Sequence, residues 1–183
     1  MKESKGLRND NFSVSKRITT YGMLVAVGAA IYILENYAPF PVPIPGARWG
    51  FSNMVIVYAL PNTSLSWLLV LAVGKSLIGS LLGGTFLSPT FLMGFSGSIV
   101  ATITMFVSFH TVKKAGLIFH STVGALFNNL AQVFIGTQII KSWAILSYLP
   151  YMEIIGIFSG IANAIVAAIL IKRMVSEKGR KEF

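Results

Sequence analysis

The chain has 183 residues, of which 54% are hydrophobic and only 11% are charged. So few charged side chains cannot coat a water-soluble globule of this size, and the composition therefore indicates an integral membrane protein. Cysteine is absent, which excludes disulfide and thiolate chemistry, and two histidines with six carboxylates do not predict a buried metal cluster. We expect neither a metal nor a cofactor.

The apolar segments predict an all-α protein. A spanning helix needs about 20 apolar residues, so we expect a single six-helix transmembrane domain over residues 18–171, with basic tails at 1–17 and 172–183. The expected spans are residues 18–38, 49–60, 65–82, 89–109, 116–140 and 145–171. The second span is short, so it must be tilted, extended into its flanking turn or partly shielded by its neighbours. No small-residue cleavage site follows the first apolar run, so we do not expect a removable signal peptide.

The first apolar segment carries Gly22, Ala26 and Ala30, spaced four apart on one helical face. Small residues at this spacing permit another helix to approach closely. That helix belongs either to this protein's own bundle or to a separate membrane subunit, and the sequence leaves both alternatives open.

A proline-rich turn, residues 39–53, follows and reads PFPVPIPGARWGFSN. Its prolines limit the freedom of the backbone, so little entropy would be lost if it closed over a ligand. It ends in Arg48, Trp49 and Asn53, and we expect it to form the lid and one wall of an outward-facing site. Alternatively, Arg48 and Trp49 are interfacial anchors, since both residue types favour the headgroup region.

The positions of lysine and arginine predict the orientation of the helices. Twelve of the fifteen basic residues lie in the two tails or beside the loop after the fourth segment, at Lys113 and Lys114. Six spans place all of these on one side, and cytoplasmic flanks carry the excess of positive charge. We therefore expect a multi-pass protein of the bacterial cytoplasmic membrane with both termini cytoplasmic. The net charge of +9 is explained by anionic lipid headgroups and does not predict nucleic-acid binding.

Polar residues of several segments fall at similar depths in the outer half of the bilayer. At about 1.5 Å of rise per residue, Lys75 lies roughly 15 Å from the inner face and Glu153 roughly 12 Å from the outer face. Ionisable groups at such depths usually face a cavity or a partner. We expect a small-molecule pocket lined by Glu35, Arg48, Trp49, Asn53, Lys75, Asn128, Asn129, Gln132 and Glu153.

Each of these residues has a structural alternative. Lys75 can snorkel or form a structural pair with Glu153, and Glu35 can be a solvated helix end. Asn129 and Gln132 can join helices by hydrogen bonds, and Asn163 is better explained in that way than as a site residue.

The run PIPGARWGFSN, together with Glu35, the charge at Lys75 and the pattern Asn129-x-x-Gln132, resembles a bacterial membrane family. That family is labelled both "Gx transporter" and "heptaprenyl diphosphate synthase component I", and it looks like a branch of the substrate-binding S components of energy-coupling factor (ECF) transporters. Two positions depart from its pattern: Lys75 stands where an arginine is expected, and Asn128 stands where a histidine is expected.

The resemblance implies a six-helix S component that captures a vitamin-like or cofactor-precursor molecule from outside. It also implies a T component, docked at the first helix through Ala26 and Ala30, and two ATPase subunits. The chain has no phosphate-binding G-x-x-x-x-G-K-[ST] motif of its own, which agrees with energy supplied from elsewhere.

The synthase label implies a different chemistry. Prenyl diphosphate synthases hold magnesium through clustered aspartates, whereas this chain has one aspartate, Asp10, in a polar tail. We therefore expect no enzyme activity. The alternatives are a non-catalytic subunit that handles an isoprenoid or quinone precursor, or a scaffold in a membrane redox assembly.

Overall fold

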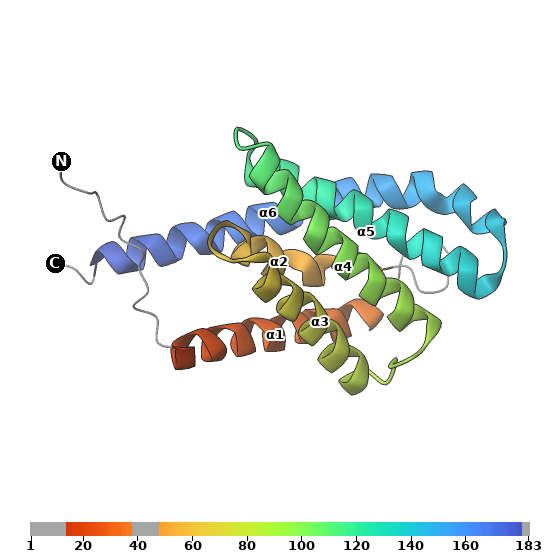
Figure 1. Cartoon of the computed structure of the whole chain (residues 1–183), viewed down its shortest axis with the longest axis horizontal. Coiled ribbons are helices and arrows are strands. Elements are labelled where there is room, and N and C mark those ends of the chain that lie inside the picture. The colour runs from red at the N-terminus through yellow and green to blue at the C-terminus, as the bar shows by residue number, and fades with distance from the viewer. Residues whose placement is uncertain (1–13, 38–47, 181–183) are drawn as a thin grey trace, which may run out of the picture.

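A computed structural model describes residues 14–37 and 48–180, with side chains described over 15–37 and 48–174, and its regular elements are all helical (Figure 1). The elements, in chain order, are α1 (Val14–Tyr37), η1 (Phe51–Asn53), α2 (Met54–Ala59), η2 (Leu60–Asn62), α3 (Leu65–Leu82), α4 (Pro89–Thr111), α5 (Leu117–Ile140), η3 (Trp143–Tyr148) and α6 (Leu149–Arg180). The prediction of an all-α protein is confirmed.

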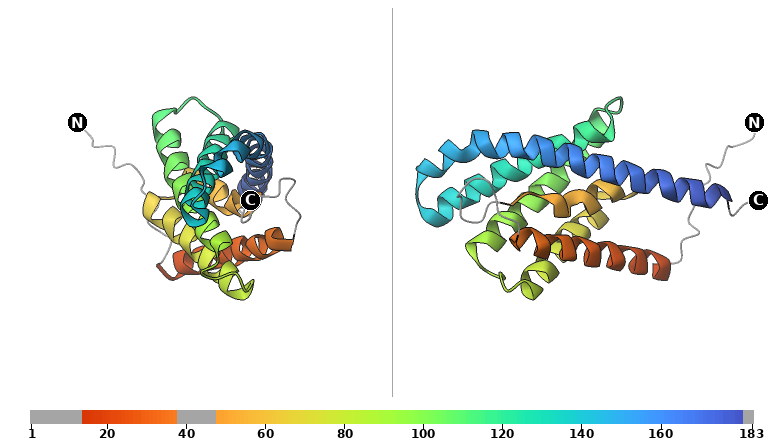
Figure 2. Two further views of the ribbon diagram at one scale, coloured as in Figure 1. Left: turned by 90° about the vertical axis from the view of Figure 1, so that its right-hand side faces the viewer. Right: turned by 180° about the vertical axis from the view of Figure 1, so that it is seen from behind.

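Successive helices run in opposite directions, so the start of α1 and the end of α6 lie at the same end of the bundle (Figures 1 and 2). Five of the described helices are long and apolar enough to cross a membrane, namely α1, α3, α4, α5 and the last helix together with η3. Helix α5 packs against both α4 and α6, and α1 packs against α3. The chain is therefore a multi-pass membrane protein by length and composition.

The predicted second span is the short helix α2, extended at its two ends by η1 and η2. It is too short to be counted among the five long helices. Its side chains are nonetheless buried, with Ile56 and Val57 almost wholly inaccessible in the main apolar core. Helix α2 contacts α6, α1 and α3. Two of the three alternatives therefore describe this segment: it is extended into its flanking turns, and it is shielded by neighbouring helices.

Local sequence signals set the other helix boundaries. Ser88 accepts a hydrogen bond from the Phe91 backbone N–H at 3.2 Å, and Pro89 occupies the first turn of α4, a common arrangement at helix starts. Helix α6 continues to Arg180, so most of the segment expected as a basic tail is a helical extension.

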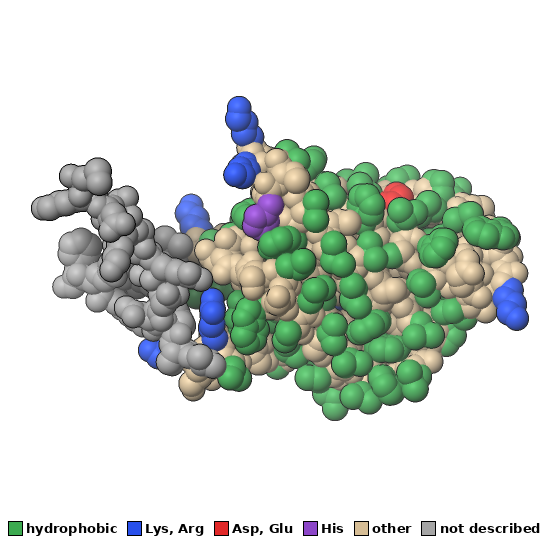
Figure 3. All heavy atoms as spheres, in the orientation of Figure 1, with side chains coloured by type: hydrophobic (Ala, Val, Ile, Leu, Met, Phe, Trp, Pro, Cys, Tyr) green, Lys and Arg blue, Asp and Glu red, His purple; other side chains and the backbone are tan. Residues whose placement is uncertain are grey.

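The surface agrees with a lipid environment. Hydrophobic side chains cover most of the visible face, and lysine and arginine side chains lie toward its edges (Figure 3). Large apolar residues on several helices are strongly exposed, among them Met23, Leu34 and Phe158. Such a continuous apolar surface is rare on a soluble monomer and is what lipid contact requires.

Candidate functional site

Three charged side chains from separate parts of the chain meet inside the bundle. Glu35 lies in the last turns of α1, Arg48 precedes η1, and Lys75 lies in α3; each is at most 7% exposed. They line one small cavity, here called the charged cavity, which has room for about one water-sized molecule. Its other lining residues are Tyr32, Gly50, Ser52, Asn53, Gly94, Ser98, Asn128 and Gln132.

Glu35 caps the start of the short second helix. Its Oε1 accepts hydrogen bonds from the backbone N–H groups of Phe51 and of Ser52, the latter at 3.2 Å. The first N–H groups of a helix have no partner within the helix, and a carboxylate also complements the positive end of the helix dipole. The alternative of a solvated helix end is therefore wrong for Glu35.

Lys75 points into the same cavity. Its Nζ donates a hydrogen bond to Ser52 Oγ at 3.1 Å, and its charged neighbours are Glu35 and Arg48. The side chain is 1% exposed, so it does not snorkel. The alternative of a structural pair with Glu153 is also wrong, because the carboxylate that interacts with Lys75 is Glu35.

Arg48 is buried against an aromatic ring. Its Cζ lies 3.6 Å from the centroid of Tyr32, a cation–π distance. None of the three guanidinium nitrogens meets a hydrogen-bond partner within the described residues. At 5% exposure Arg48 is not an interfacial anchor. Trp49, by contrast, is half-buried and stacks on Phe51, with ring centroids 5.9 Å apart.

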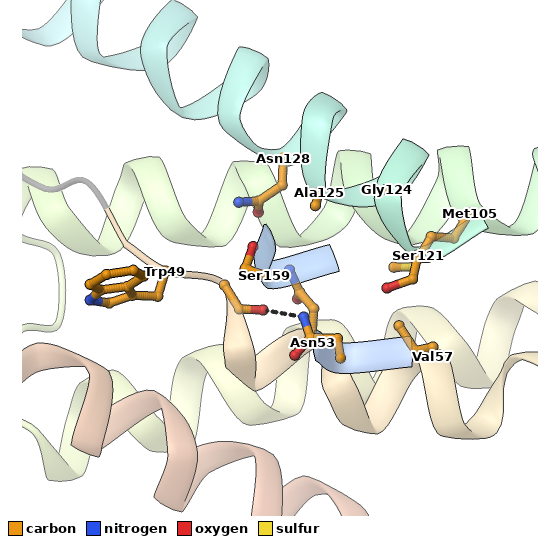
Figure 4. Close-up of a pocket in the computed structure, with 11 residues that line it drawn as sticks. Trp49, Asn53, Val57, Met105, Ser121, Gly124, Ala125, Asn128 and Ser159 are labelled. Carbon is orange, nitrogen blue, oxygen red and sulfur yellow. Dashed lines mark hydrogen bonds between the residues drawn. The ribbon is translucent and has the colours of Figure 1, made fainter. Parts of the chain in front are cut away.

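A second cavity of similar small size, here called the neutral cavity, adjoins the first (Figure 4). The two share Gly50, Asn53 and Asn128. Figure 4 shows Trp49, Asn128 and Ser159 toward one end of the neutral cavity and Met105 and Val57 toward the other. The remaining lining residues are Ser121, Gly124, Ala125 and Asn163.

The described end of the proline-rich turn descends into the bundle instead of lying above it. Gly50, with a φ of 81°, adopts the left-handed conformation that glycine tolerates. Its carbonyl accepts a hydrogen bond from Asn163 Nδ2 at 3.0 Å, in the middle of α6. This is the structural role expected for Asn163, although the residue also lines the neutral cavity. Residues 38–47, the greater part of the expected lid, lie outside the described residues.

The predicted residues of α5 and α6 divide between the cavities and the helix contacts. Asn129 Nδ2 donates to the Met152 carbonyl at 2.6 Å, so the interhelical alternative is confirmed for Asn129, which lines neither cavity. Gln132 lines the charged cavity, where its Oε1 is buried without a hydrogen-bond partner among the described residues. Glu153 is only partly buried and lines neither cavity. The structure therefore does not bring Glu153 to the charged cavity.

The sequence reasoning missed Tyr32, Ser52 and Ser98. Tyr32 precedes Glu35 by three residues and so shares its helical face, a signal that was available. Ser98 Oγ donates to Asn53 Oδ1 at 3.2 Å and comes from a segment in which serine and glycine are frequent. That composition alone does not single out one serine.

A substitution at Gly94 tests the position assigned to the Arg48 side chain. A Cβ atom at Gly94 would lie 3.2 Å from Arg48 Cδ and 3.3 Å from Nε. Gly94→Ala should therefore push the guanidinium aside by a few tenths of an ångström and weaken any binding of a small anion such as N-acetylglycine at Arg48 several-fold. Isothermal titration in detergent measures the effect. Gly116→Ala is the control, because a Cβ there meets nothing within 4 Å; equal affinities for the two variants would contradict the assigned position.

Comparison with known proteins adds one finding. The sequence model of one protein family, described as heptaprenyl diphosphate synthase component I, matches residues 24–170, which is most of the chain and includes both cavities. No curated protein and no solved structure matches the chain.

Proposed function

This chain belongs to the heptaprenyl diphosphate synthase component I family, and we propose that it is a non-catalytic membrane subunit that binds a small anionic molecule. More specifically, we propose that it is the S component of an ECF-type uptake transporter, taking up a vitamin-like or cofactor-precursor molecule. The family match and the long apolar helices support a membrane subunit.

The observation that carries this proposal is the buried guanidinium of Arg48, which has no hydrogen-bond partner among residues 15–37 and 48–174. A buried charge without hydrogen-bond partners is costly, and the planar guanidinium fork suits a carboxylate or phosphate with two parallel hydrogen bonds. Lys75 adds a second cation to the same cavity, against the single carboxylate of Glu35. An anionic ligand would neutralise the excess charge.

The proposed orientation places both termini in the cytoplasm and the end of α1 at the outer side. The start of α1 and the end of α6 lie at one end of the bundle, and most basic residues flank these ends or the loop at Lys113 and Lys114. Cytoplasmic flanks with excess lysine and arginine have this pattern, which also favours contact with anionic lipid headgroups. The membrane proposed is the bacterial cytoplasmic membrane.

The proposed docking face for a T component lies on α1. Gly22, Ala26 and Ala30 are all exposed, and a Cβ at Gly22 would meet nothing within 4 Å. Small exposed residues let a second helix come close in the membrane. Two ATPase subunits would complete the complex, because this chain has no phosphate-binding loop.

Bulky residues on this face should block docking. We expect the double variant Ala26→Leu with Ala30→Leu to lose co-purification with a T protein, because the added side chains hold the helices apart, while ligand binding is unchanged. Pull-down from membranes followed by mass spectrometry measures this. Val27→Leu, on an exposed apolar position of the same helix, is the control. Retention of the T protein by the double variant would contradict docking at this face.

The family description supports a second candidate, a non-catalytic subunit that handles an isoprenoid precursor. A subunit for a quinone precursor and a scaffold in a membrane redox assembly are further alternatives, which rest on the sequence alone. A catalytic prenyltransferase role is opposed by the sequence, since Asp10 is the single aspartate available for a magnesium site. The two candidates differ in their partners: ATPase subunits for the transporter, a prenyltransferase or redox subunit for the alternative.

Native mass spectrometry of the protein extracted in mild detergent tests the proposal. We expect an adduct of small-molecule mass, lost in Arg48→Ala and in Lys75→Ala and retained in the control Lys113→Ala, which removes an exposed lysine outside the cavities. A protein without any adduct, or an adduct retained by both cavity variants, would contradict the proposed site.

A further inference from the structure

The unpaired polar atoms of the charged cavity define the chemistry of a complementary ligand. Within the described residues, Arg48 supplies three nitrogens that lack an acceptor, while Glu35 Oε2 and Gln132 Oε1 are acceptors that lack a donor. A guanidinium can only donate, and a carboxylate can only accept. A molecule that pairs all of them must carry acceptor oxygens and at least one N–H or O–H group.

The fixed charges limit the net charge of that molecule. Arg48 and Lys75 contribute two positive charges and Glu35 one negative charge, which leaves an excess of one positive charge. One anionic group on the ligand balances this excess. A diphosphate would place further negative charge beside Glu35, and a neutral molecule would leave Arg48 uncompensated in a site of low dielectric constant.

The neutral cavity continues the same site. It joins the charged cavity at Gly50, Asn53 and Asn128, and it adds Ser121, Ser159 and Asn163 without any charged side chain. Asn163 Oδ1 is a further buried acceptor without a partner among the described residues. The Ser121 and Ser159 hydroxyls already donate to the backbone carbonyls of α6. An apolar polyprenyl tail placed here would leave Asn163 Oδ1 unpaired, whereas a polar uncharged group could donate to it.

We propose that the ligand is an elongated monoanion, an inference that rests on the proposed binding function. Its one carboxylate or singly charged phosphoryl group lies at Arg48 and Lys75, its N–H or O–H donors face Glu35 and Gln132, and its uncharged polar end occupies the neutral cavity. This class excludes isoprenoid diphosphates.

Thermal stabilisation of the protein in lipid nanodiscs by defined probes tests this class. Three probes, orotate, N-acetylglycine and lactate, are monoanions with N–H or O–H donors. Benzoate is a monoanion without donors, and uracil is a neutral molecule with donors. Geranyl diphosphate is a polyanion with an apolar tail. We expect at least one of the first three probes to raise the melting temperature at concentrations at least tenfold below those at which benzoate or uracil raises it. Stabilisation mainly by geranyl diphosphate or uracil, or by none of the six probes, would overturn the proposal.

Two variants connect the probe results to named atoms. Arg48→Gln should abolish stabilisation by every monoanion, whereas Gln132→Leu should remove the preference for the donor-bearing probe over benzoate without weakening benzoate. An unchanged preference in Gln132→Leu would overturn the assignment of Gln132. If the probes fail but an Arg48-dependent adduct is seen in native mass spectrometry, the binding function stands and the monoanion class is wrong.

Discussion

Replacement of Arg48 by methionine is expected to abolish ligand binding and, at the same time, to stabilise the ligand-free protein. The guanidinium is 5% exposed, and its nitrogens lack hydrogen-bond partners within the described residues. Replacing a whole buried ion pair or triad by apolar side chains of similar volume is often neutral or stabilising by about 1–4 kcal/mol. We extend this reasoning to Arg48 alone, because Glu35 keeps Lys75 as an opposite charge when Arg48 is removed. Loss of the cation–π contact with Tyr32 offsets about 0.5–2 kcal/mol of this gain.

The charges that remain in the cavity also favour stabilisation of the Arg48→Met protein. Without Arg48, the charged cavity retains Glu35 and Lys75, one charge of each sign. We therefore expect Arg48→Met to raise the free energy of unfolding by about 1–3 kcal/mol, or the melting temperature by roughly 2–10 °C for a chain of this size. Thermal unfolding in detergent and native mass spectrometry measure the two effects on one sample.

Lys113→Met is the matched control, because it removes an exposed cation and should change neither quantity. A destabilised Arg48→Met protein would show that the guanidinium contributes to the fold in the ligand-free state. Arg48 would then be a structural residue, and its buried guanidinium would no longer support the binding proposal.

The sequence predicted the long helices because a bilayer imposes a length and an apolar composition on each of them. The bilayer does not set the length of the second predicted span, residues 49–60, in this way. Helix α2 is surrounded by α1, α3 and α6, so its backbone and side chains are shielded by protein, and the usual span length does not apply. Its place in the centre of the bundle depends on tertiary contacts that no local pattern encodes.

Depth along a helix was predictable from the rise per residue, but the direction of a side chain around the helix was not. Asn128 and Asn129 are neighbours in sequence and nearly equal in depth. Successive residues are turned by about 100°, so Asn128 lines both cavities while Asn129 bonds the Met152 carbonyl of α6. The rise per residue likewise put Glu153 among the expected pocket residues, yet it lies outside both cavities.

The same residues hold the short helix and line the charged cavity. Ser52 illustrates this, because its backbone N–H donates to Glu35 and its hydroxyl accepts from Lys75. A ligand that draws Lys75 or Glu35 toward itself would therefore change the anchoring of η1 and α2. Binding and the position of α2 are coupled through shared hydrogen bonds.

Glu35 and Lys75 should consequently show strong energetic coupling. Glu35→Gln keeps an oxygen that can accept from the Phe51 and Ser52 N–H groups, so it mainly removes the charge. Two buried cations then remain without a carboxylate, and we expect a loss of about 3–5 kcal/mol in the free energy of unfolding.

Lys75→Met alone should have a smaller effect, about 1 kcal/mol or less, because Glu35 and Arg48 still balance each other and one hydrogen bond to Ser52 is lost. In the Glu35→Gln background, however, the same change removes one of two uncompensated cations. It should restore about 1–3 kcal/mol, the range seen for residues in direct interaction. Unfolding of the unsubstituted protein, the two single variants and the double variant in mixed detergent micelles measures this double-mutant cycle.

Lys113→Met combined with Glu35→Gln provides the control cycle, and its two effects should add, because Lys113 is exposed and lines neither cavity. Additive effects for Glu35→Gln and Lys75→Met would show that the two side chains do not share one electrostatic environment. The excess positive charge of the cavity, from which the anionic ligand is inferred, depends on that shared environment. A coupled cycle together with a stabilised Arg48→Met protein would mean that Glu35 and Lys75 serve the fold as a pair while Arg48 is retained for the ligand.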